Sequence, residues 1–454
     1  MKTSIIGYPR IGGLRELKFA SEKYFRGEID QAELETTAAK IRAYDLELQK
    51  NSGLDFIPSN DFSYYDGVLD TAFLFGAVPA RYTSLGLSPL DTYFAAARGY
   101  QGEKGDVKAL AMKKWFNTNY HYMVPEIDDD THIHLSGSKP FDLFTEALEN
   151  GVRTKPVIVG AYTFLKLARY KGEKKAADFV DEAAKAYADL LDRFASLGAE
   201  WVQFDEPSLV MDMTAEDIKL FVSLYEKILP GKKSVKVLLQ TYFGDVRDCY
   251  KEICALDVDG IGLDFVEGKE TFDLVTKNGF PKGKALFAGV VNGKNIWRNK
   301  YVVSYLTILG IKDHASEIVI GTSCSLLHVP CTLRNETKLP DSVRKHFAYA
   351  EEKLSELTEL KKIAESEHPG DTPEYKYNQS LHTEIRSGYN EAVRDRISQL
   401  TEKDFVRLPA FAEREKIQKK RFGLPLFPTT TIGSFPQTSD VKTARRDHRR
   451  GELS

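Results

Sequence analysis

Residues 176–205 read AADFVDEAAKAYADLLDRFASLGAEWVQFD, a long amphipathic stretch that passes through a glycine into a short apolar run. The apolar residues that recur at helical spacing are Phe179, Ala183, Ala186, Leu190, Leu191, Phe194 and Leu197. Gly198 follows at the place where a helix commonly ends in left-handed backbone. A helix that leads directly into a strand at Trp201–Asp205 predicts an α/β fold with parallel strands.

The same alternation runs through most of the chain. The candidate strands are Ser4–Tyr8, Asp55–Pro58, Asn117–Tyr122, Pro156–Gly160, Trp201–Asp205, Val235–Thr241, Gly260–Phe265, Ala285–Val291 and Ile318–Ser323. Strand and helix in repeated alternation predict a (βα)8 TIM-type barrel, which needs about 250 residues. Nine candidates are one too many for eight strands, so we expect the polar Asn117–Tyr122 segment to lie outside the barrel.

Polar residues stand at the ends of several candidate strands. They are Ser59-Asn60-Asp61, Asp205-Glu206, Gln240-Thr241, Asp264, Asn292 and Ser323. A barrel of this type builds its site on the rim where its strands end. Polar residues also end strands without any function, and for a single one of them this alternative stays open.

The character of the chain changes beyond about Pro340. Residues Val343–Glu365 predict a charged helix whose apolar stripe packs against the barrel wall. Residues 374–421 are rich in Tyr, Asn, Glu, Lys and Arg, which is typical of a solvated connector with helical pieces. We therefore expect a barrel over residues 1–365, a charged connector over 366–424 and a further unit over 425–454.

An internal repeat links the two ends of the chain. Thr3–Pro9 reads TSIIGYP and Thr430–Pro436 reads TTIGSFP, while Arg26–Ile29 (RGEI) returns as Arg450–Leu453 (RGEL) at nearly the same distance. Two matches in the same order indicate a duplicated unit. Since the second copy stops at Ser454, we expect residues 425–454 to be the first strand and part of a helix of a truncated second barrel.

Composition places the chain in the globular class, with 42% hydrophobic and 28% charged residues. A net charge of −3 gives little attraction to nucleic acid or to an acidic membrane, and no apolar run is long enough to span a bilayer. Four cysteines are too few for a disulfide framework and suggest a reducing compartment. We expect a cytoplasmic protein without nucleic-acid or membrane partners.

Two segments carry recognition chemistry. Arg10–Lys18 (RIGGLRELK) follows the first strand, and its glycines and cations suit an anionic ligand near a helix start. Lys113–Tyr122 (KKWFNTNYHY) combines cations with aromatic rings, which suits a planar heterocycle that bears carboxylates. The alternatives are a solvated strand-to-helix turn for the first segment and a core-facing aromatic strand for the second.

Two further clusters are candidate reactive centres. Cys324, His328 and Cys331 lie within eight residues, yet a fourth zinc ligand is not evident and the spacing matches no paired zinc loop. Asp205 and Glu206 end a strand, but consecutive strand residues point to opposite faces and do not form a side-by-side pair. We therefore assign no catalytic and no metal residue from these clusters.

Seven strings of the chain together resemble the cobalamin-independent methionine synthases. They are IGYPRIGGLRELK, IPSNDFSYYDGVLD, MKKWFNTNYHYMVPE, WVQFDEPSLV, GVVNGKNIWR, SCSLLH and FPTTTIGSFPQT. The resemblance implies two (βα)8 barrels and methyl transfer from 5-methyltetrahydropteroyltri-L-glutamate to L-homocysteine, which gives L-methionine without cobalamin. It also implies a catalytic zinc held by His, Cys, Glu and Cys in the carboxy-terminal barrel, beyond Ser454 and so absent from this chain.

The resemblance also assigns ligand-binding positions. Folate-binding residues of the family match Arg15, Glu16, Leu17, Lys18 and Lys114, and homocysteine-contacting residues match Ile432, Gly433 and Ser434. This implies that the chain binds folate, holds only part of a homocysteine site, needs a missing carboxy-terminal barrel as partner and is inactive alone. Two alternatives stay open, namely a non-catalytic barrel that binds folate or another acidic ligand, and a metal-free hydrolase or lyase that uses Asp205 or Glu206.

Overall fold

A computed structural model describes residues 1–384, 389–431 and 433–454 of the chain. The chain forms two compact units, Met1–Glu384 and Ile385–Ser454, which are described separately below.

The first unit is a barrel of eight strands. The strands are β1 (Lys2–Ser4), β2 (Ile57–Ser59), β8 (Thr154–Val159), β10 (Trp201–Asp205), β11 (Lys236–Gln240), β12 (Gly260–Asp264), β13 (Ala285–Val291) and β14 (Glu317–Thr322). Every neighbouring pair is parallel and follows chain order, and β14 returns to β1. A parallel bridge between Ser4 and Phe56 joins the first two strands and completes the ring. The (βα)8 barrel expected from the sequence is confirmed.

The ninth candidate strand lies outside the barrel, as expected. Its residues belong to an antiparallel hairpin of β5 (Met112–Lys114) and β6 (His121–Met123), with Lys114 opposite His121. Two more small pairs lie outside the ring, β3 (Tyr100–Gly102) with β4 (Gly105–Val107) and β7 (Glu126–Ile127) with β9 (Arg169–Tyr170). The barrel strands are buried on both faces, whereas all three residues of β5 are exposed, which explains the polar composition of the hairpin.

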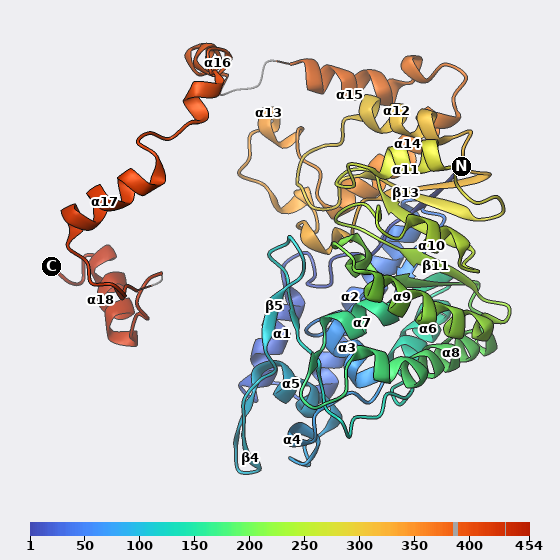
Figure 1. Ribbon diagram of the computed structural model, residues 1–454, viewed down its shortest axis with the longest axis horizontal. Coiled ribbons are helices and arrows are strands. Elements are labelled where there is room, and N and C mark those ends of the chain that lie inside the picture. The colour runs from blue at the N-terminus through green and yellow to red at the C-terminus, as the bar shows by residue number, and fades with distance from the viewer. Residues whose placement is uncertain (385–388, 432) are drawn as a thin grey trace. The chain divides into compact units, whose positions relative to one another are not determined.

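Helices surround the ring and cover its outer face (Figure 1). The α-helices of this unit are α1 (Glu16–Phe25), α2 (Gln31–Asn51), α3 (Gly67–Leu74), α4 (Ala80–Thr83), α5 (Pro89–Arg98), α6 (Lys139–Glu149), α7 (Ala161–Leu167), α8 (Val180–Ser196), α9 (Ala215–Ile228), α10 (Tyr250–Ala255), α11 (Thr271–Asn278), α12 (Tyr301–Ile311), α13 (Asp341–Arg344), α14 (Ala350–Glu365) and α15 (Pro373–Thr383). Helix α8 buries the predicted stripe except for Leu197 at its end, which is 38% exposed, and Gly198 just after it has φ +77°. One apolar layer fills the space between strands and helices, and a separate cluster of Trp201, Leu238, Ala285, Phe287 and Val319 fills the barrel interior.

The helix expected over Val343–Glu365 begins later, at Ala350. The residues before it form the short helix α13 and then a bridge in which Phe347 opposes Trp297, so tertiary pairing replaces the first turns of the helix. Helix α14 packs on β1, β13 and β14 through its predicted apolar stripe, in agreement with a helix laid on the barrel wall.

The compact unit continues past residue 365, where the sequence suggested the end of the barrel. Helix α15 packs on α12 and α14. Asn378 fixes this contact, since its Oδ1 accepts from the Tyr301 amide at 2.9 Å and its Nδ2 donates to the Asn299 carbonyl at 2.8 Å. Asn378 and Leu381 of this segment are therefore buried in the compact unit, which extends to Glu384, whereas Tyr377 is 54% exposed.

The second unit contains α16 (Glu391–Ser398), α17 (Phe411–Phe422) and α18 (Ser439–Arg449). Within its described ranges, 389–431 and 433–454, no residue is assigned to a strand, so the strand expected near residues 430–436 is absent there. Leu426, Phe427 and Phe435 are 82%, 85% and 76% exposed. The apolar pattern that suggested a strand has no neighbouring strand to pair with in these ranges.

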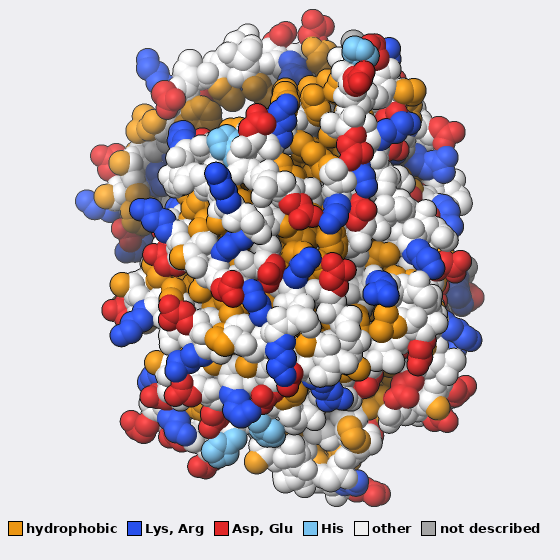
Figure 2. All heavy atoms as spheres, turned by 90° about the vertical axis from the view of Figure 1, so that its right-hand side faces the viewer, with side chains coloured by type: hydrophobic (Ala, Val, Ile, Leu, Met, Phe, Trp, Pro, Cys, Tyr) orange, Lys and Arg blue, Asp and Glu red, His pale blue; other side chains and the backbone are white. Residues whose placement is uncertain are grey.

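Basic and acidic side chains are interspersed over the face shown in Figure 2, in keeping with a net charge of −3. Among the residues described, no helix combines the length and the apolar character that a membrane crossing requires.

Candidate functional site

A network of hydrogen-bonded polar side chains runs through the barrel interior toward the ends of the strands. Lys155 on β8 donates to the Ile5 carbonyl at 2.9 Å and to Gln203 Oε1. Gln203 Nε2 donates to Asp205 Oδ1 at 2.7 Å, and the Tyr242 hydroxyl donates to Asp205 Oδ2 at 3.1 Å. Both carboxylate oxygens of Asp205 are therefore engaged by the protein itself.

Burial shifts the pKa values of the two charged groups in this network in opposite directions. Desolvation raises the pKa of Asp205 and lowers the pKa of Lys155, because each group is held away from water. The charge of each partner opposes the shift of the other. The pair joins three barrel segments, and its geometry is that of a satisfied internal network.

Glu206, the next residue, points to the other side of the strand. Its carboxylate accepts from the amides of Tyr162 and Thr163 at 3.0 and 2.7 Å, at the start of α7, and from the Tyr225 hydroxyl at 2.6 Å. Burial raises its pKa to about 7. The expectation that Asp205 and Glu206 do not act as a side-by-side pair is confirmed, because one contacts the interior and the other the surrounding helices.

The β5–β6 hairpin reaches over the barrel mouth. Trp115 and Phe116 at its tip pack against a cluster that contains Tyr242 and Phe243. The ring centroids of Phe116 and Phe243 are 5.8 Å apart. Beneath the tip lies a cavity of about 110 Å³, which is small for a ligand of drug size.

A polar triad anchors the hairpin tip to the opposite rim. Asn117 Nδ2 donates to Glu267 Oε2 at 2.9 Å, and Lys294 donates to Asn117 Oδ1 at 3.0 Å. Lys294 also lies 2.7 Å from Glu267 Oε1, which closes the triad. One amide of the segment that suggested heterocycle binding, that of Asn117, thus holds the hairpin in place.

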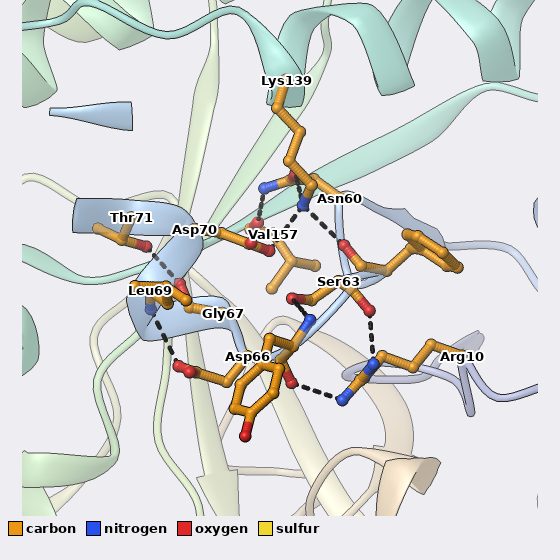
Figure 3. Close-up of polar contacts among 12 residues, drawn as sticks. Arg10, Asn60, Ser63, Asp66, Gly67, Leu69, Asp70, Thr71, Lys139 and Val157 are labelled. Atoms are coloured by element: carbon orange, nitrogen blue, oxygen red, sulfur yellow. Dashed lines mark hydrogen bonds and ion pairs between the residues drawn. The ribbon is translucent and has the colours of Figure 1, made fainter. Parts of the chain in front are cut away.

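A second network of polar contacts lies beside the end of β2 (Figure 3). Lys139 donates to Asn60 Oδ1 at 3.0 Å and lies 2.8 Å from Asp70 Oδ2. Asp66 caps α3 by accepting from the amides of Val68 and Leu69 at 2.8 and 2.9 Å. These contacts fix the segment that follows β2, whose polar residues had marked the rim in the sequence.

The predicted folate residues lie on and beside α1. Arg15 precedes the helix with φ 65° and is exposed, and Lys18 is exposed with its ammonium 2.9 Å from Glu22 Oε1. Glu16 Oε2 accepts from the Leu14 amide at 3.0 Å. Leu17 is only 1% exposed, so its side chain belongs to the core between α1 and α2.

Lys114, the remaining predicted folate residue, is exposed on β5. Arg10 lies in the loop that leads to α1 and contacts the β5–β6 hairpin that carries Lys114. The Arg10 guanidinium donates to the Tyr120 hydroxyl at 2.8 Å and to the Ser63 carbonyl at 2.6 Å. The two segments singled out in the sequence therefore border the same end of the barrel.

The side chains considered for zinc have separate partners. The Cys331 thiol contacts the Gly12 carbonyl at 3.4 Å, while Cys324 is fully buried. The His328 ring lies between Tyr120 and Phe243, and burial lowers its pKa to about 4. Within the described residues, no group of three or more His, Cys, Asp or Glu side chains is arranged to hold a metal ion.

The predicted homocysteine residues belong to the second unit. Ile432 lies outside the described residues, and Gly433 and Ser434 are exposed. Sequence reasoning overlooked Lys155 and Lys139. A lysine inside the apolar run of β8 was the available signal for the first, because a charged residue on a buried strand needs a partner.

Comparison with known proteins places the chain in a family. A family profile described as "Cobalamin-independent synthase, N-terminal domain" matches residues 2–316, and one described as "Cobalamin-independent synthase, Catalytic domain" matches residues 427–454. The chain belongs to the cobalamin-independent methionine synthase family. The resemblance stated from the sequence is thereby confirmed.

Relatives in this family are similar along the whole chain. A 5-methyltetrahydropteroyltriglutamate–homocysteine methyltransferase of Streptococcus pneumoniae serotype 4 is 53% identical over 454 residues, which is 100% of this chain and 60% of that protein. The enzyme of the same name from Lactococcus lactis is 52% identical over 453 residues, and this chain covers 59% of its length. The chain thus spans about 60% of the length of these methionine synthase relatives.

Solved structures support the fold. A protein described as a vitamin-B12 independent methionine synthase, from Listeria monocytogenes, superposes with a TM-score of 0.57 at 14% identity, over 81% of this chain and 98% of that one. A B12-independent methionine synthase from Shewanella gives a TM-score of 0.51 at 14% identity, over 73% and 88%. At this identity the likeness concerns the barrel architecture.

Proposed function

We propose that this chain provides the folate-binding barrel for methyl transfer from 5-methyltetrahydropteroyltri-L-glutamate to L-homocysteine. The proposal rests on the similarity to methyltransferases of that name, which are 53% identical over 454 residues and 52% identical over 453 residues. Because the chain spans about 60% of those proteins, we propose the complete reaction for the whole protein and folate binding for the barrel.

The exposed cations at one end of the barrel support the tail-binding part of the proposal. Arg15, Lys18 and Lys114 are exposed, and a triglutamate tail is a chain of carboxylates. Charge-assisted hydrogen bonds from such cations to carboxylates are short and about twice as strong as neutral ones. In this proposal Leu17 positions the segment from within the core and does not touch the ligand through its side chain.

The described residues do not fit the catalytic zinc that the family resemblance implies. Cys324, His328 and Cys331 contact different partners, and burial raises the pKa of Cys331 to about 12, which disfavours the thiolate that binds zinc. We therefore derive no chemical step at a metal from these residues. Their part in the proposed reaction is to bind and orient the folate.

A hydrolase or lyase centred on Asp205 is disfavoured by the geometry. Gln203 and Tyr242 occupy both of its oxygens, and the cavity above it is small. A general acid or base needs a free oxygen within hydrogen-bond reach of its substrate.

Calorimetry with folates of different tail length tests the proposal. We expect the triglutamate form to bind more tightly than the monoglutamate form, with a difference that shrinks as salt rises. Replacing Lys18 or Lys114 with alanine should weaken triglutamate binding about fivefold, which corresponds to about 1 kcal/mol for an exposed cation. Binding of the monoglutamate should remain unchanged.

Lys185→Ala is the matched control, since Lys185 is an exposed helical lysine paired with Asp189 at 2.6 Å as Lys18 is paired with Glu22. The control variant should bind both folates like the parent chain. Equal affinity for the two tail lengths, or an effect of Lys185→Ala as large as that of Lys18→Ala, would overturn the assignment.

A further inference from the structure

A small cavity of about 30 Å³ lies behind the barrel mouth, between α2, the end of β2 and the loop after β1. Its lining includes Tyr8, Asp45, Gln49 and Asp61, which all present oxygen atoms. The volume suits one ion or one or two water molecules, because about 10–15 Å³ of such space holds one water.

A buried hydrogen-bond acceptor at this cavity lacks a donor. Gln49 is only 2% exposed, and its Oε1 is buried without a hydrogen-bond partner among the described residues. Its Nε2 donates to the Asp45 carbonyl at 3.0 Å, which fixes which end of the amide is the unpartnered one. An unsatisfied buried acceptor costs about 1–3 kcal/mol, so a missing donor or cation is expected nearby.

Asp45 lies one turn before Gln49 on the same face of α2. Within the described part of the chain, no hydrogen bond or ion pair to its carboxylate is found, and its charged neighbours Asp61 and Glu16 are both acidic. Burial, reinforced by Asp61, raises the pKa of Asp45 to about 8. Asp61 accepts a hydrogen bond from the Tyr8 amide at 2.7 Å. Burial raises the pKa of Asp61 as well, although the charges of Lys155 and Lys139 oppose this shift.

The two arginines that line the cavity do not neutralise these carboxylates. Arg10 donates to the Ser63 carbonyl and to Tyr120. Arg42 donates a bidentate pair of hydrogen bonds to the Glu146 carboxylate at 2.7 and 2.6 Å. Both guanidinium groups are therefore committed to other acceptors, and Asp45 has no cationic neighbour that would compensate its charge.

We propose that this cavity binds one hard divalent cation of the Mg²⁺ or Ca²⁺ class, held by oxygens of Asp45, Asp61 and Gln49. Carboxylate and amide oxygens are the ligands that such cations prefer, and two aspartates balance a charge of +2. The ion joins α2 to Asp61, whose carboxylate already holds the backbone of Tyr8. It therefore stiffens the start of the loop that leads through Arg10 to α1, independently of whether folate binds there.

Thermal melting after chelation tests this proposal. The chain is freed of metal at pH 8.5 and melted with millimolar MgCl₂, CaCl₂ or NaCl at matched ionic strength. At a hundredfold excess over Kd we expect one of the divalent ions to raise Tm by about 3–5 °C, with no comparable effect of sodium. The increase should shrink toward pH 5, because protons compete with the ion for the two carboxylates.

Asp45→Asn and Gln49→Met locate the effect. Asp45→Asn should abolish the increase in Tm, and Gln49→Met, which keeps both carboxylates, should lower the affinity measured by calorimetry. Asp212→Asn removes an exposed carboxylate and should leave the increase intact. The proposal is overturned if neither divalent ion raises Tm of the parent chain, which would mean that a proton alone neutralises the pair, or if Asp45→Asn retains the full response.

Discussion

Glu206→Ala is expected to destabilise the barrel in a manner that depends on pH. The Glu206 side chain is 0% exposed and is the common acceptor for the amides of Tyr162 and Thr163 and for the hydroxyl of Tyr225. These three contacts join β10 to the start of α7 and to α9. Alanine removes the acceptor and leaves three buried donors without a partner.

The expected magnitude follows from the contacts. Each unsatisfied buried donor costs about 1–3 kcal/mol, and water that enters the vacated space restores part of this, so we expect a loss of about 4 kcal/mol where Glu206 is protonated. The parent chain carries an opposing cost. The pKa of Glu206 is about 7 in the folded chain, above the unfolded value of 4.5. The stability of the parent chain therefore falls by about 3 kcal/mol as the pH rises from 4.5 through 7.

The variant lacks that slope because it lacks the carboxyl group. We therefore expect Glu206→Ala to lose about 4 kcal/mol near pH 5 and only about 1 kcal/mol near pH 8. Urea unfolding followed by circular dichroism at both pH values measures the difference, provided that the m-values of the two proteins agree.

Two further variants make the test specific. Glu206→Gln keeps an acceptor oxygen and should lie between the parent chain and the alanine variant at pH 5. Glu226→Ala removes an exposed glutamate on α9 and should change stability by less than about 0.5 kcal/mol. A loss for Glu206→Ala that is equal at pH 5 and pH 8, or no larger than that of Glu226→Ala, would refute the reasoning.

Two more predictions concern the barrel mouth. Asn117→Ala breaks the contacts to Glu267 and Lys294 and should speed hydrogen exchange of the hairpin amides while global stability changes by less than about 1 kcal/mol; unchanged exchange would contradict the anchoring role. His328 has a folded pKa of about 4, below its unfolded value of 6.5, so the parent chain should lose stability as the pH falls from 6.5 to 4. His328→Gln should remove this part of the acid sensitivity in urea unfolding, and an identical pH profile would count against it.

The barrel was predictable because parallel strands that are buried on both faces are continuous apolar runs. The run Ala285–Val291 matches β13 at both ends. The first strand shows where the pattern misleads, since Ser4–Tyr8 was expected and β1 ends at Ser4. Ile5 and Ile6 are buried beyond it, but their carbonyls accept from Lys155 and Gln203 rather than from a neighbouring strand.

The polar interior was not predictable in the same way. Lys155 meets the Ile5 carbonyl across 150 positions of sequence, and Asp205 meets Tyr242 across 37. Only the register of the closed barrel brings such residues together, and no local spacing encodes it. The rim residues that the sequence did indicate, such as Asn60, were found because they directly follow a recognisable strand.

The distribution of engaged and free polar groups indicates where a large anionic ligand can bind. Inside the mouth, Lys155 and Asp205 are satisfied by protein partners, and the hairpin tip packs above them. On the rim, the ammonium of Lys114 has no ion-pair partner among the described residues, and the guanidinium of Arg15 lies over the ring of Phe19 without an ion-pair partner there. A ligand gains most from donors that need not leave an existing partner. The proposed tail binding should therefore depend on exposed cations, and its affinity should fall with ionic strength far more steeply than that of an enclosed site.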